Sequence, residues 1–453
     1  MKRIWMLLTL GVLLAGCTPQ GTVTPEPTPA EQSADPVSED PVSEDPVSED
    51  PVSEDPVSED PVIPEGNEKD MQMWISATVN WNRLRTPQLI GKVLDQIKEV
   101  GLNEVIVEVK MMEGGTCYPS ELMPQLITHN RADHNFDYLQ VFIDECRKRD
   151  LKIGAALTVF PTWGLGESYK YKDSMFEDKY CQELLSNKGL TDIRDNPSSG
   201  IFGFLNPVYP EVRAMVMDLC EEVVSKYDID ALVLDYCRWQ DYHSDFSEAS
   251  RKAFEAYYGS PVENFPDCVM YFDENNGEHY GELFNPWMEW RASVIQGYVK
   301  EINERVKAIK PDVSLEYWAG SWVSFATGQN WGSQTRNWSK SNWWATENFY
   351  KTGFADYLDV FQNGAYVSVL ADYLNWLATG KYRVNGACKH YATFSDAGNK
   401  VNVESFIYEG LMRCDGLMVF ELCHTTTGHY WDAIKKGIER AKINGCAFIP
   451  EGE

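Results

Sequence analysis

The stretch formed by residues 228–239 constrains the fold more than any other part of the sequence. It begins with a nearly uninterrupted apolar run at residues 229–234, which is typical of a strand buried on both faces of a parallel sheet. The run ends abruptly at Asp235, and Arg238 follows. Because βα barrels build their active sites at the carboxyl ends of their strands, we expect Asp235 to carry chemistry. The alternative is a salt bridge between Asp235 and Arg238 that only ties a loop.

Strand-like and helix-like patterns alternate through the rest of residues 71–453. The predicted strands cover residues 73–81, 104–112, 151–160, 229–234, 313–318, 357–363, 382–390 and 416–422. Eight strands interleaved with helices predict an α/β fold, a closed parallel (β/α)8 TIM barrel with loop insertions. One insertion, residues 164–205, is long enough to shape a binding cleft or to be simply mobile.

Residues 1–17 have the pattern of a secretory signal: a basic start, a short apolar core and small residues before Cys17. The end of this segment resembles a bacterial lipobox, which implies cleavage before Cys17 and attachment of lipid to it. Acyl chains at Cys17 would hold the protein at a membrane surface. Thr18 stands where Asp would imply retention at the inner membrane, so we expect a lipid-anchored protein of the cell envelope, at the outer membrane.

Residues 18–70 are rich in Pro, Ser, Thr, Glu and Asp, and residues 38–62 repeat Ser-Glu-Asp-Pro-Val five times. This segment has almost no large apolar residue and can bury no core, so it predicts a disordered linker rather than a folded repeat domain. It carries 16 acidic residues against Lys69 alone. Self-repulsion should keep it extended, as a stalk between the membrane anchor and the barrel.

The barrel segment is itself acidic, with a net charge of −16 of the −29 that the whole chain carries. Such a surface argues against nucleic acid or anionic lipid as a partner. Ten cysteines besides Cys17 show no Cys-x-x-Cys spacing, and several lie inside apolar runs as small buried hydrophobes. The seven histidines lack metal-like spacing, so we expect no metal and no cofactor and disfavour a metal-dependent deacetylase or lyase.

Carboxylates recur at the predicted strand ends, and aromatic residues stand beside them. Glycoside hydrolysis needs one carboxylic acid to protonate the leaving oxygen and one carboxylate to attack or to activate water. Aromatic faces suit the apolar faces of sugar rings. We expect Asp235 to act as nucleophile or base and Glu316, near the end of the next predicted strand, to act as general acid. Arg238 would keep Asp235 ionised, and a more enclosed Glu316 would keep its proton.

Other residues near the strand ends are candidates for substrate contact. They are Trp81, Glu108, Lys110, Asn206, Tyr236, Arg238, Trp239, Trp318, Trp322, Gln362 and Glu421. Each has a structural alternative: tryptophans are mostly packing residues, Glu108 could be paired inside the barrel, and Glu421 could support another residue rather than touch substrate.

Several blocks match a known family. They are Asn-Pro at 206–207, Pro-Glu-Val-Arg at 210–213, Tyr-Asp-Ile-Asp-Ala at 227–231, Leu-Asp-Tyr-Cys-Arg-Trp at 234–239, Val-Glu-Val-Lys at 107–110, Tyr-Pro-Ser-Glu-Leu at 118–122 and Gly-Phe-Ala-Asp-Tyr-Leu-Asp at 353–359. Together they resemble the family-10-like glycosyl hydrolases, often described as alpha-amylase-like. The resemblance implies a (β/α)8 barrel with Asp235 at the catalytic aspartate position. Leu234, where relatives are often acidic, and Gln240, where proline is usual, depart from the pattern.

The leading hypothesis is therefore a lipid-anchored glycoside hydrolase of an unidentified poly- or oligosaccharide. The alternative is a non-catalytic, glycan-binding surface lipoprotein that has kept the barrel and its aromatic residues. Asp235 and Glu316 should distinguish the two, because side chains that point apart or are sequestered would favour the binding protein.

Overall fold

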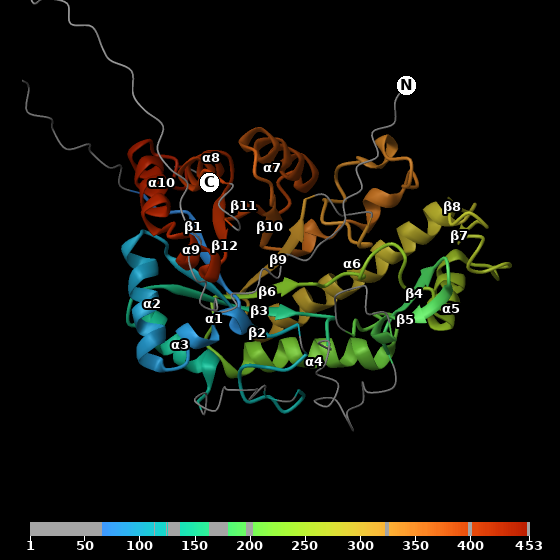
Figure 1. Cartoon of the computed structure of the whole chain (residues 1–453), viewed down its shortest axis with the longest axis horizontal. Helices are drawn as coiled ribbons and strands as arrows, with labels where there is room; N and C mark the ends of the chain where they lie inside the picture. Colours follow the sequence, from blue (N-terminus) through green and yellow to red (C-terminus); the bar gives the residue numbers. More distant parts are fainter. Residues whose placement is uncertain are drawn as a thin grey trace, which may run out of the picture. The chain divides into compact units, whose positions relative to one another are not determined.

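The fold is a closed barrel of eight parallel strands, as the sequence predicts (Figure 1). The computed structural model describes residues 66–112, 114–123, 125, 136–162, 180–195, 203–321, 326–396 and 401–450. The predicted signal segment, the predicted lipidation site at Cys17 and nearly all of the predicted linker at residues 18–70 lie outside the described residues.

The barrel strands pair in the order β1-β12-β11-β10-β9-β6-β3-β2. They are β1 (Asp70–Ile75), β2 (Glu104–Lys110), β3 (Lys152–Thr158), β6 (Ala231–Asp235), β9 (Ser314–Gly320), β10 (Val360–Gly364), β11 (Lys389–Ser395) and β12 (Gly416–Phe420). Two hairpins decorate the loops after β3 and β6: β4 (Glu183–Ser186) with β5 (Gly189–Asp192), and β7 (Met270–Phe272) with β8 (Glu278–Tyr280). The first hairpin falls inside the insertion predicted at residues 164–205.

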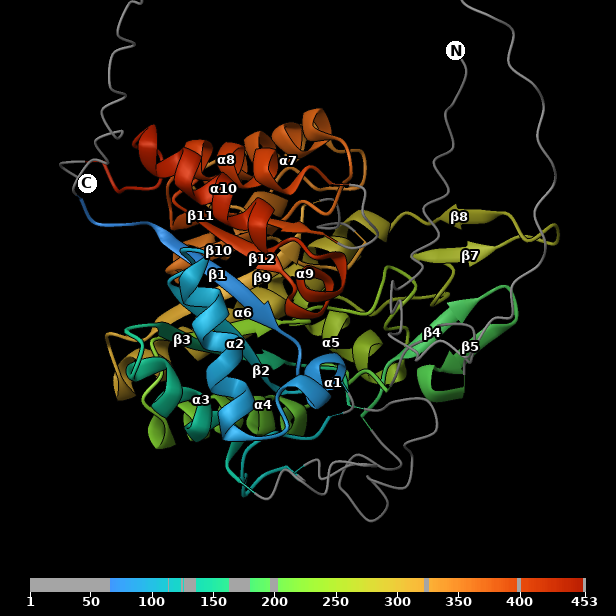
Figure 2. The same ribbon diagram turned by 60° about the vertical axis from the view of Figure 1, so that its left-hand side comes forward.

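Helices surround the barrel, and α7, α8 and α10 lie side by side outside β10 to β12 (Figures 1 and 2). The helices are α1 (Ala77–Asn80), α2 (Pro87–Glu99), α3 (Tyr138–Arg147), α4 (Pro210–Lys226), α5 (Glu248–Tyr258), α6 (Phe284–Ile309), α7 (Leu370–Val384), α8 (Val403–Arg413), α9 (Leu422–Gly428) and α10 (Trp431–Ile443). Short 3-10 turns lie at Trp81–Arg83, Ile193–Asp195, Ser339–Ser341, Phe349–Thr352 and Ala355–Tyr357. Within the described ranges, no helix is both long and apolar enough to span a membrane.

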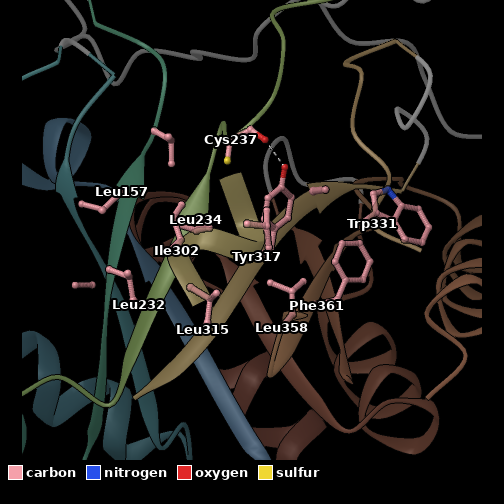
Figure 3. Packing of buried hydrophobic residues seen from close by; sticks show 14 of the residues in the cluster. Leu157, Leu232, Leu234, Cys237, Ile302, Leu315, Tyr317, Trp331, Leu358 and Phe361 are labelled. Carbon is pink, nitrogen blue, oxygen red and sulfur yellow. Dashed lines mark hydrogen bonds between the residues drawn. The ribbon is translucent and has the colours of Figure 1, made fainter. Parts of the chain in front are cut away.

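The strands are apolar on both faces because both faces are buried. Leu232 and Leu234 of β6 and Leu315 of β9 point outward, where they pack with Ile302 of α6 (Figure 3). Tyr317 lies on the same outward face and donates a hydrogen bond to the carbonyl of Cys237 at 2.5 Å. Residues at alternate positions point into the barrel instead.

The inward residues form layers along the barrel axis. Along β2, Glu104 comes first, Ile106 lies one step nearer the carboxyl end, and Glu108 lies one step further. Ile106 belongs to an apolar layer that crosses the barrel interior, made of Trp74, Ile106, Ala156, Ala231, Val233 and Met418, with Trp318 and Phe420 packed against it. This layer separates the polar residues at the amino-terminal side from the carboxyl end of the barrel, which we call the barrel mouth.

Two of the predicted strands were misplaced. The first strand ends at Ile75 rather than at residue 81, because α1 and a 3-10 turn follow it. The seventh was predicted at residues 382–390, but residues 382–384 close α7, and Asn385 ends that helix in the left-handed conformation with a φ of 52°. The strand itself is β11, so its carboxyl end lies beside Asp396.

Candidate active site

Asp235 is the last residue of β6 and lies at the barrel mouth, where the sequence places it. Its side chain is 8% exposed, and its Oδ1 accepts a hydrogen bond from the backbone N–H of Tyr236 at 2.7 Å. Burial raises the pKa of Asp235 to about 7, although Arg238 and the Tyr236 N–H oppose the shift. The carboxyl group therefore changes its charge near neutral pH.

Arg238 does not pair with Asp235. Its Nη1 donates to the carbonyl oxygens of Trp239 at 2.9 Å and Gln240 at 2.8 Å, and its guanidinium lies 4.6 Å from the centre of the Tyr236 ring. In the described ranges no hydrogen bond or ion pair joins Arg238 to Asp235. The loop-tying salt bridge is therefore wrong, and so is the expectation that Arg238 holds Asp235 ionised: burial outweighs its charge.

Glu421 is a second carboxylate at the mouth. It follows β12, which lies opposite β6 in the strand order, and it caps the amino end of α9. Its Oε2 accepts from Asn80 Nδ2 at 2.9 Å and from the Ser76 N–H at 3.3 Å, and its Oε1 accepts from the Cys423 N–H at 2.9 Å. Burial raises the pKa of Glu421 to about 7 against these three donors.

Glu108 is a third carboxylate at this end of the barrel. Its Oε2 accepts the backbone N–H of Ala77 at 3.0 Å, and its side chain is 7% exposed. Tyr236 is half-buried beside it, and the pKa of Tyr236 is raised to about 12 by burial first and then by the negative charges of Asp235 and Glu108. Tyr236 thus links the β6 and β2 sides of the mouth.

Half-buried aromatic rings line the mouth from β9, the neighbour of β6, round to β12 on the opposite side; we call this set the aromatic arc. Trp318 lies 5.4 Å from Tyr366, Tyr366 lies 5.3 Å from Phe420, and Phe420 lies 5.9 Å from His424, measured between ring centroids. Gly364 allows this packing, because a Cβ there would lie 2.7 Å from the Trp318 ring. Rings at these positions offer apolar faces beside the carboxylates.

Tyr366 is influenced by carboxylates on both the β6 side and the β12 side of the mouth. Its pKa is raised well above its usual value by burial first, then by the charge of Asp235, with smaller contributions from Tyr236 and Glu421. Asp235 and Glu421 therefore both lie within electrostatic reach of one phenol.

Asp396 and His424 stand behind Glu421. His424 Nδ1 lies 3.7 Å from Asp396 Oδ1, and Thr425 Oγ1 donates to Asp396 Oδ2 at 2.8 Å. Burial, with a smaller contribution from the charge of Glu421, raises the pKa of Asp396 to about 7. Burial lowers the pKa of His424, so its ring is neutral at neutral pH.

Glu316 does not lie at the mouth, contrary to our prediction. β9 runs on to Gly320, so Glu316 is the third of seven residues and lies below the apolar layer. Its carboxylate accepts from Gln362 Nε2 at 2.7 Å, Gln72 Nε2 at 3.0 Å and Ser314 Oγ at 3.2 Å. Gln72 also donates to Glu104 at 3.0 Å. We call Gln72, Glu104, Glu316 and Gln362 the polar layer.

Several predicted substrate contacts are also placed elsewhere. Gln362 is fully buried in the polar layer. Lys110 is fully buried, and its Nζ donates to the carbonyls of Thr158 and Pro161. Asn206 is fully buried, and its amide donates to Asp245 at 2.5 Å. These side chains form hydrogen bonds with other buried groups, as most buried polar residues do, so they stabilise the fold rather than contact substrate.

Two of the predicted tryptophans are packing residues. Trp81 lies in a 3-10 turn and stacks on Tyr138, with ring centroids 6.0 Å apart. Trp239 is fully buried, and its Nε1 donates to the Arg291 carbonyl at 3.1 Å. Trp322 lies outside the described residues. The structure thus brings together Asp235, Glu108, Tyr236, Arg238, Trp318 and Glu421 of the predicted set.

Sequence reasoning missed Tyr366, Phe420 and Asp396 as parts of the site, whereas His424 stands with Glu421 among the residues at the predicted strand ends. Asp396 was missed because the seventh strand was placed too early, so its carboxyl end was not examined. The Asn385-Gly386 pair was the available signal, since Asn and Gly in the left-handed region commonly end a helix.

Comparison with known proteins then identifies the family. A family model described as glycosyl hydrolase-like 10 matches residues 71–384. The chain belongs to this family. The matched residues of the glycosyl hydrolase-like 10 family include Asp235, Glu108 and Tyr366, whereas Glu421 and Asp396 lie beyond them. The resemblance drawn from the sequence motifs is thereby confirmed, and so is the expectation of a glycosidase-like protein.

Curated relatives match this chain over part of their length. A glycosyl hydrolase of Bacillus subtilis, YngK, is 28% identical over 62% of this chain and 51% of its own length. The glycosyl hydrolase DigH of Escherichia coli K12 is 25% identical over 53% of this chain and 49% of its own. An S-layer-related protein of Niallia circulans is 26% identical over 78% of this chain and 23% of its own. The chain spans about half or less of these relatives.

Solved structures share the barrel fold at low identity. Alpha-L-fucosidase isoenzyme 2 of Paenibacillus thiaminolyticus has a TM-score of 0.55 at 14% identity, over 84% of this chain and 50% of that one. The PgaB (BpsB) glycoside hydrolase domain of Bordetella bronchiseptica has a TM-score of 0.54 at 11% identity, over 82% of this chain and 98% of that one. These likenesses support the fold alone.

Proposed function

We propose that this protein is a glycoside hydrolase of a poly- or oligosaccharide that uses Asp235 and Glu421 as its pair of carboxyl groups. One observation carries the proposal: two buried carboxyl groups with pKa values of about 7 stand at the barrel mouth, on opposite strands, and both lie within electrostatic reach of Tyr366. A pair in which one group holds a proton and the other does not is the requirement of glycoside hydrolysis.

Each group has a distinct role in the proposed reaction. Glu421, when protonated, donates its proton to the glycosidic oxygen of the leaving sugar. Asp235, when ionised, attacks the anomeric carbon or takes a proton from the attacking water. The sugar ring lies against the aromatic arc, and Tyr236, Arg238 and Glu108 border the Asp235 side of the site. The chemistry requires no metal and no cofactor.

The choice of Glu421 replaces Glu316, which lies below the apolar layer. That sequestered position of Glu316 is the observation that favours the alternative function, a glycan-binding protein without catalysis. The presence of Glu421 and Glu108 at the mouth answers it, because two carboxylates besides Asp235 remain at that end of the barrel.

Membrane anchoring is part of the same proposal and is supported by the sequence alone. Lipid on Cys17 and the acidic linker of residues 18–70 would hold the barrel away from the surface of the cell envelope. Expression in bacteria grown with a fatty acid that carries a clickable alkyne tests it. The full chain should be labelled and sediment with membranes, and Cys17→Ser should do neither; labelling of both proteins would contradict the anchor.

Hydrolysis of a broad glycan panel by the purified full chain, beside Asp235→Asn, tests the proposed activity. We expect cleavage of at least one glycan by the parent and a loss of about a thousandfold or more in the variant, because an amide cannot replace the carboxylate. Asp312→Asn, at an exposed aspartate just before β9, is the matched control and should keep parental activity. Binding of a glycan without cleavage, unchanged in Asp235→Asn, would instead establish the non-catalytic alternative.

A further inference from the structure

A second group of aromatic residues stands outside the barrel mouth. Trp343 stacks on Phe284 with ring centroids 5.8 Å apart and an interplanar angle of 7°, and Tyr280 lies 5.1 Å from Trp343 and 4.3 Å from Phe284. We call these three residues the aromatic platform. Phe284 is 1% exposed, whereas Trp343 is 62% exposed and Tyr280 is 40% exposed. Two large rings are thus kept at the surface over a buried one.

The platform belongs to the same side of the protein as the mouth. Tyr280 ends the β7–β8 hairpin in the loop after β6, Phe284 begins α6, and Trp343 lies in the loop after β9. Loops that follow barrel strands gather at the carboxyl end of the barrel. Figures 1 and 2 show the hairpin standing out from the barrel at the start of α6.

The platform rests on a packed aromatic base at the start of α6. Asn285 Nδ2 donates to the Trp343 carbonyl at 3.0 Å and ties the start of α6 to the loop after β9. One turn along α6, the fully buried Trp287 stacks on Phe246 at 5.3 Å and packs on Trp290 at 4.5 Å. Rings that are already fixed lose little conformational entropy when a ligand stacks on them, which favours binding.

Carboxylates border the platform. Glu278 accepts the Tyr280 hydroxyl, and it also accepts Tyr242 at 3.2 Å and faces His243 Nε2 at 2.9 Å. The segment of residues 263–290 holds seven Asp or Glu residues and no Lys or Arg. Glu278 is thus already engaged by neighbouring groups, but the net negative charge of this segment attracts amino groups and repels sugars that carry carboxylate or sulfate.

We propose that the aromatic platform is a carbohydrate-binding site that holds a polymeric glycan of uncharged or amine-bearing sugars, apart from the carboxyl pair at the mouth. The choice of a glycan as ligand rests on the proposed function. The exposed faces of Trp343 and Tyr280 stack on the apolar faces of sugar rings, and the acidic segment of residues 263–290 attracts amino groups and repels acidic ones. A glycan held on the aromatic platform is contacted over a longer stretch than the mouth alone could contact.

Affinity electrophoresis of the full chain tests this site. The gels contain hydroxyethyl cellulose, glycol chitosan or hyaluronan, and every protein carries Asp235→Asn so that no glycan is consumed. We expect retardation by hydroxyethyl cellulose or glycol chitosan and none by hyaluronan. Trp343→Ala should weaken that retardation roughly tenfold, and Tyr280→Ala by less, because each removes one stacking ring. Tyr382→Ala, at a 52% exposed tyrosine on α7, is the matched control and should match its parent.

Several outcomes would overturn the site. They are no retardation in any gel, equal retardation of Trp343→Ala and its parent, or retardation by hyaluronan as strong as by the other two. The test is independent of hydrolysis. Loss of binding in Trp343→Ala together with no cleavage of the glycan panel by the unsubstituted chain would refute the proposed function and keep the site, whereas cleavage by the unsubstituted chain without any effect of Trp343→Ala on retardation would do the reverse.

Discussion

The barrel holds two sets of buried carboxyl groups, and the apolar layer separates them. Asp235 and Glu421 lie at the mouth, and Glu104 and Glu316 lie in the polar layer below the apolar one. Burial raises the pKa of all four. Glu316 accepts hydrogen bonds from three side chains, two of them amides. Asp235 accepts one backbone N–H among the described contacts.

A raised pKa therefore does not by itself mark a catalytic group in this barrel. Structural networks shift pKa values as strongly as active sites do. The amides of Gln72 and Gln362 satisfy the Glu316 oxygens, and the apolar layer separates them from the mouth, so no sugar could reach them. Asp235 has oxygen lone pairs left for a substrate or a water, and it ends a strand at the mouth.

Replacing one glutamate of each set by glutamine gives the largest expected difference in kcat/KM. We expect Glu421→Gln to lower kcat/KM about a hundredfold or more, because a glutamine cannot deliver a proton to the leaving sugar. Glu316→Gln should stay within about threefold of the parent, because a glutamine keeps the size and most hydrogen bonds of the polar layer. The measurement is the initial rate on the best glycan of the panel, with circular dichroism to confirm folding.

Glu108→Gln serves as the companion variant. A loss in Glu108→Gln that exceeds the loss in Glu421→Gln would assign the acid to Glu108, and equal losses in Glu316→Gln and Glu421→Gln would refute the distinction between the two layers.

The same contrast shows what a sequence can and cannot predict here. The barrel and the place of Asp235 follow from hydrophobic patterning, because the apolar run that marks a strand buried on both faces stops at Asp235, the last residue of β6. Glu316 was misread because Tyr317, Trp318 and Ala319 extend the strand beyond it, and local pattern does not tell an inward glutamate from one at the rim. Register decides between them, and register depends on partners far away in the chain.

The second prediction concerns stability and tests the polar layer. The pKa of Glu316 is raised from an ordinary 4.5 to about 7, so its folded form holds a proton that the unfolded chain releases. The contribution of this proton to the free energy of unfolding is complete below pH 4.5 and is lost as the pH rises through about 7. The lost free energy of unfolding amounts to about 3 kcal/mol. We expect the full chain to unfold at lower denaturant at pH 8 than at pH 5.

Glu316→Gln should reduce this pH dependence, because a glutamine has no proton to lose. Unfolding by urea at both pH values, followed by tryptophan fluorescence, measures the difference for parent and variant. Asp312→Asn, at an exposed position, should retain the parental difference. An identical pH dependence in Glu316→Gln and the parent would show that Glu316 is ionised in the folded protein.

The smallest expected effect is a shift in the pH profile of the rate, and it identifies the role of Glu421. Two groups with pKa values of about 7 predict a bell-shaped rate profile with its maximum near pH 7. The charges of Asp396 and Glu421 repel each other, since the pKa of Asp396 is raised in part by Glu421. Asp396→Asn removes that repulsion, keeps an acceptor for Thr425, and should lower the pKa of Glu421 by a fraction of a unit.

The limb that moves then shows what Glu421 does. If Glu421 is the general acid, its protonated form is the active one, and Asp396→Asn moves the alkaline limb of kcat/KM to lower pH. If it is the base or nucleophile, the acid limb moves to lower pH instead. A profile that does not move in either limb would count against a part for Glu421 in the proton transfers, and a larger loss in Glu108→Gln than in Glu421→Gln would then assign the second carboxylate to Glu108.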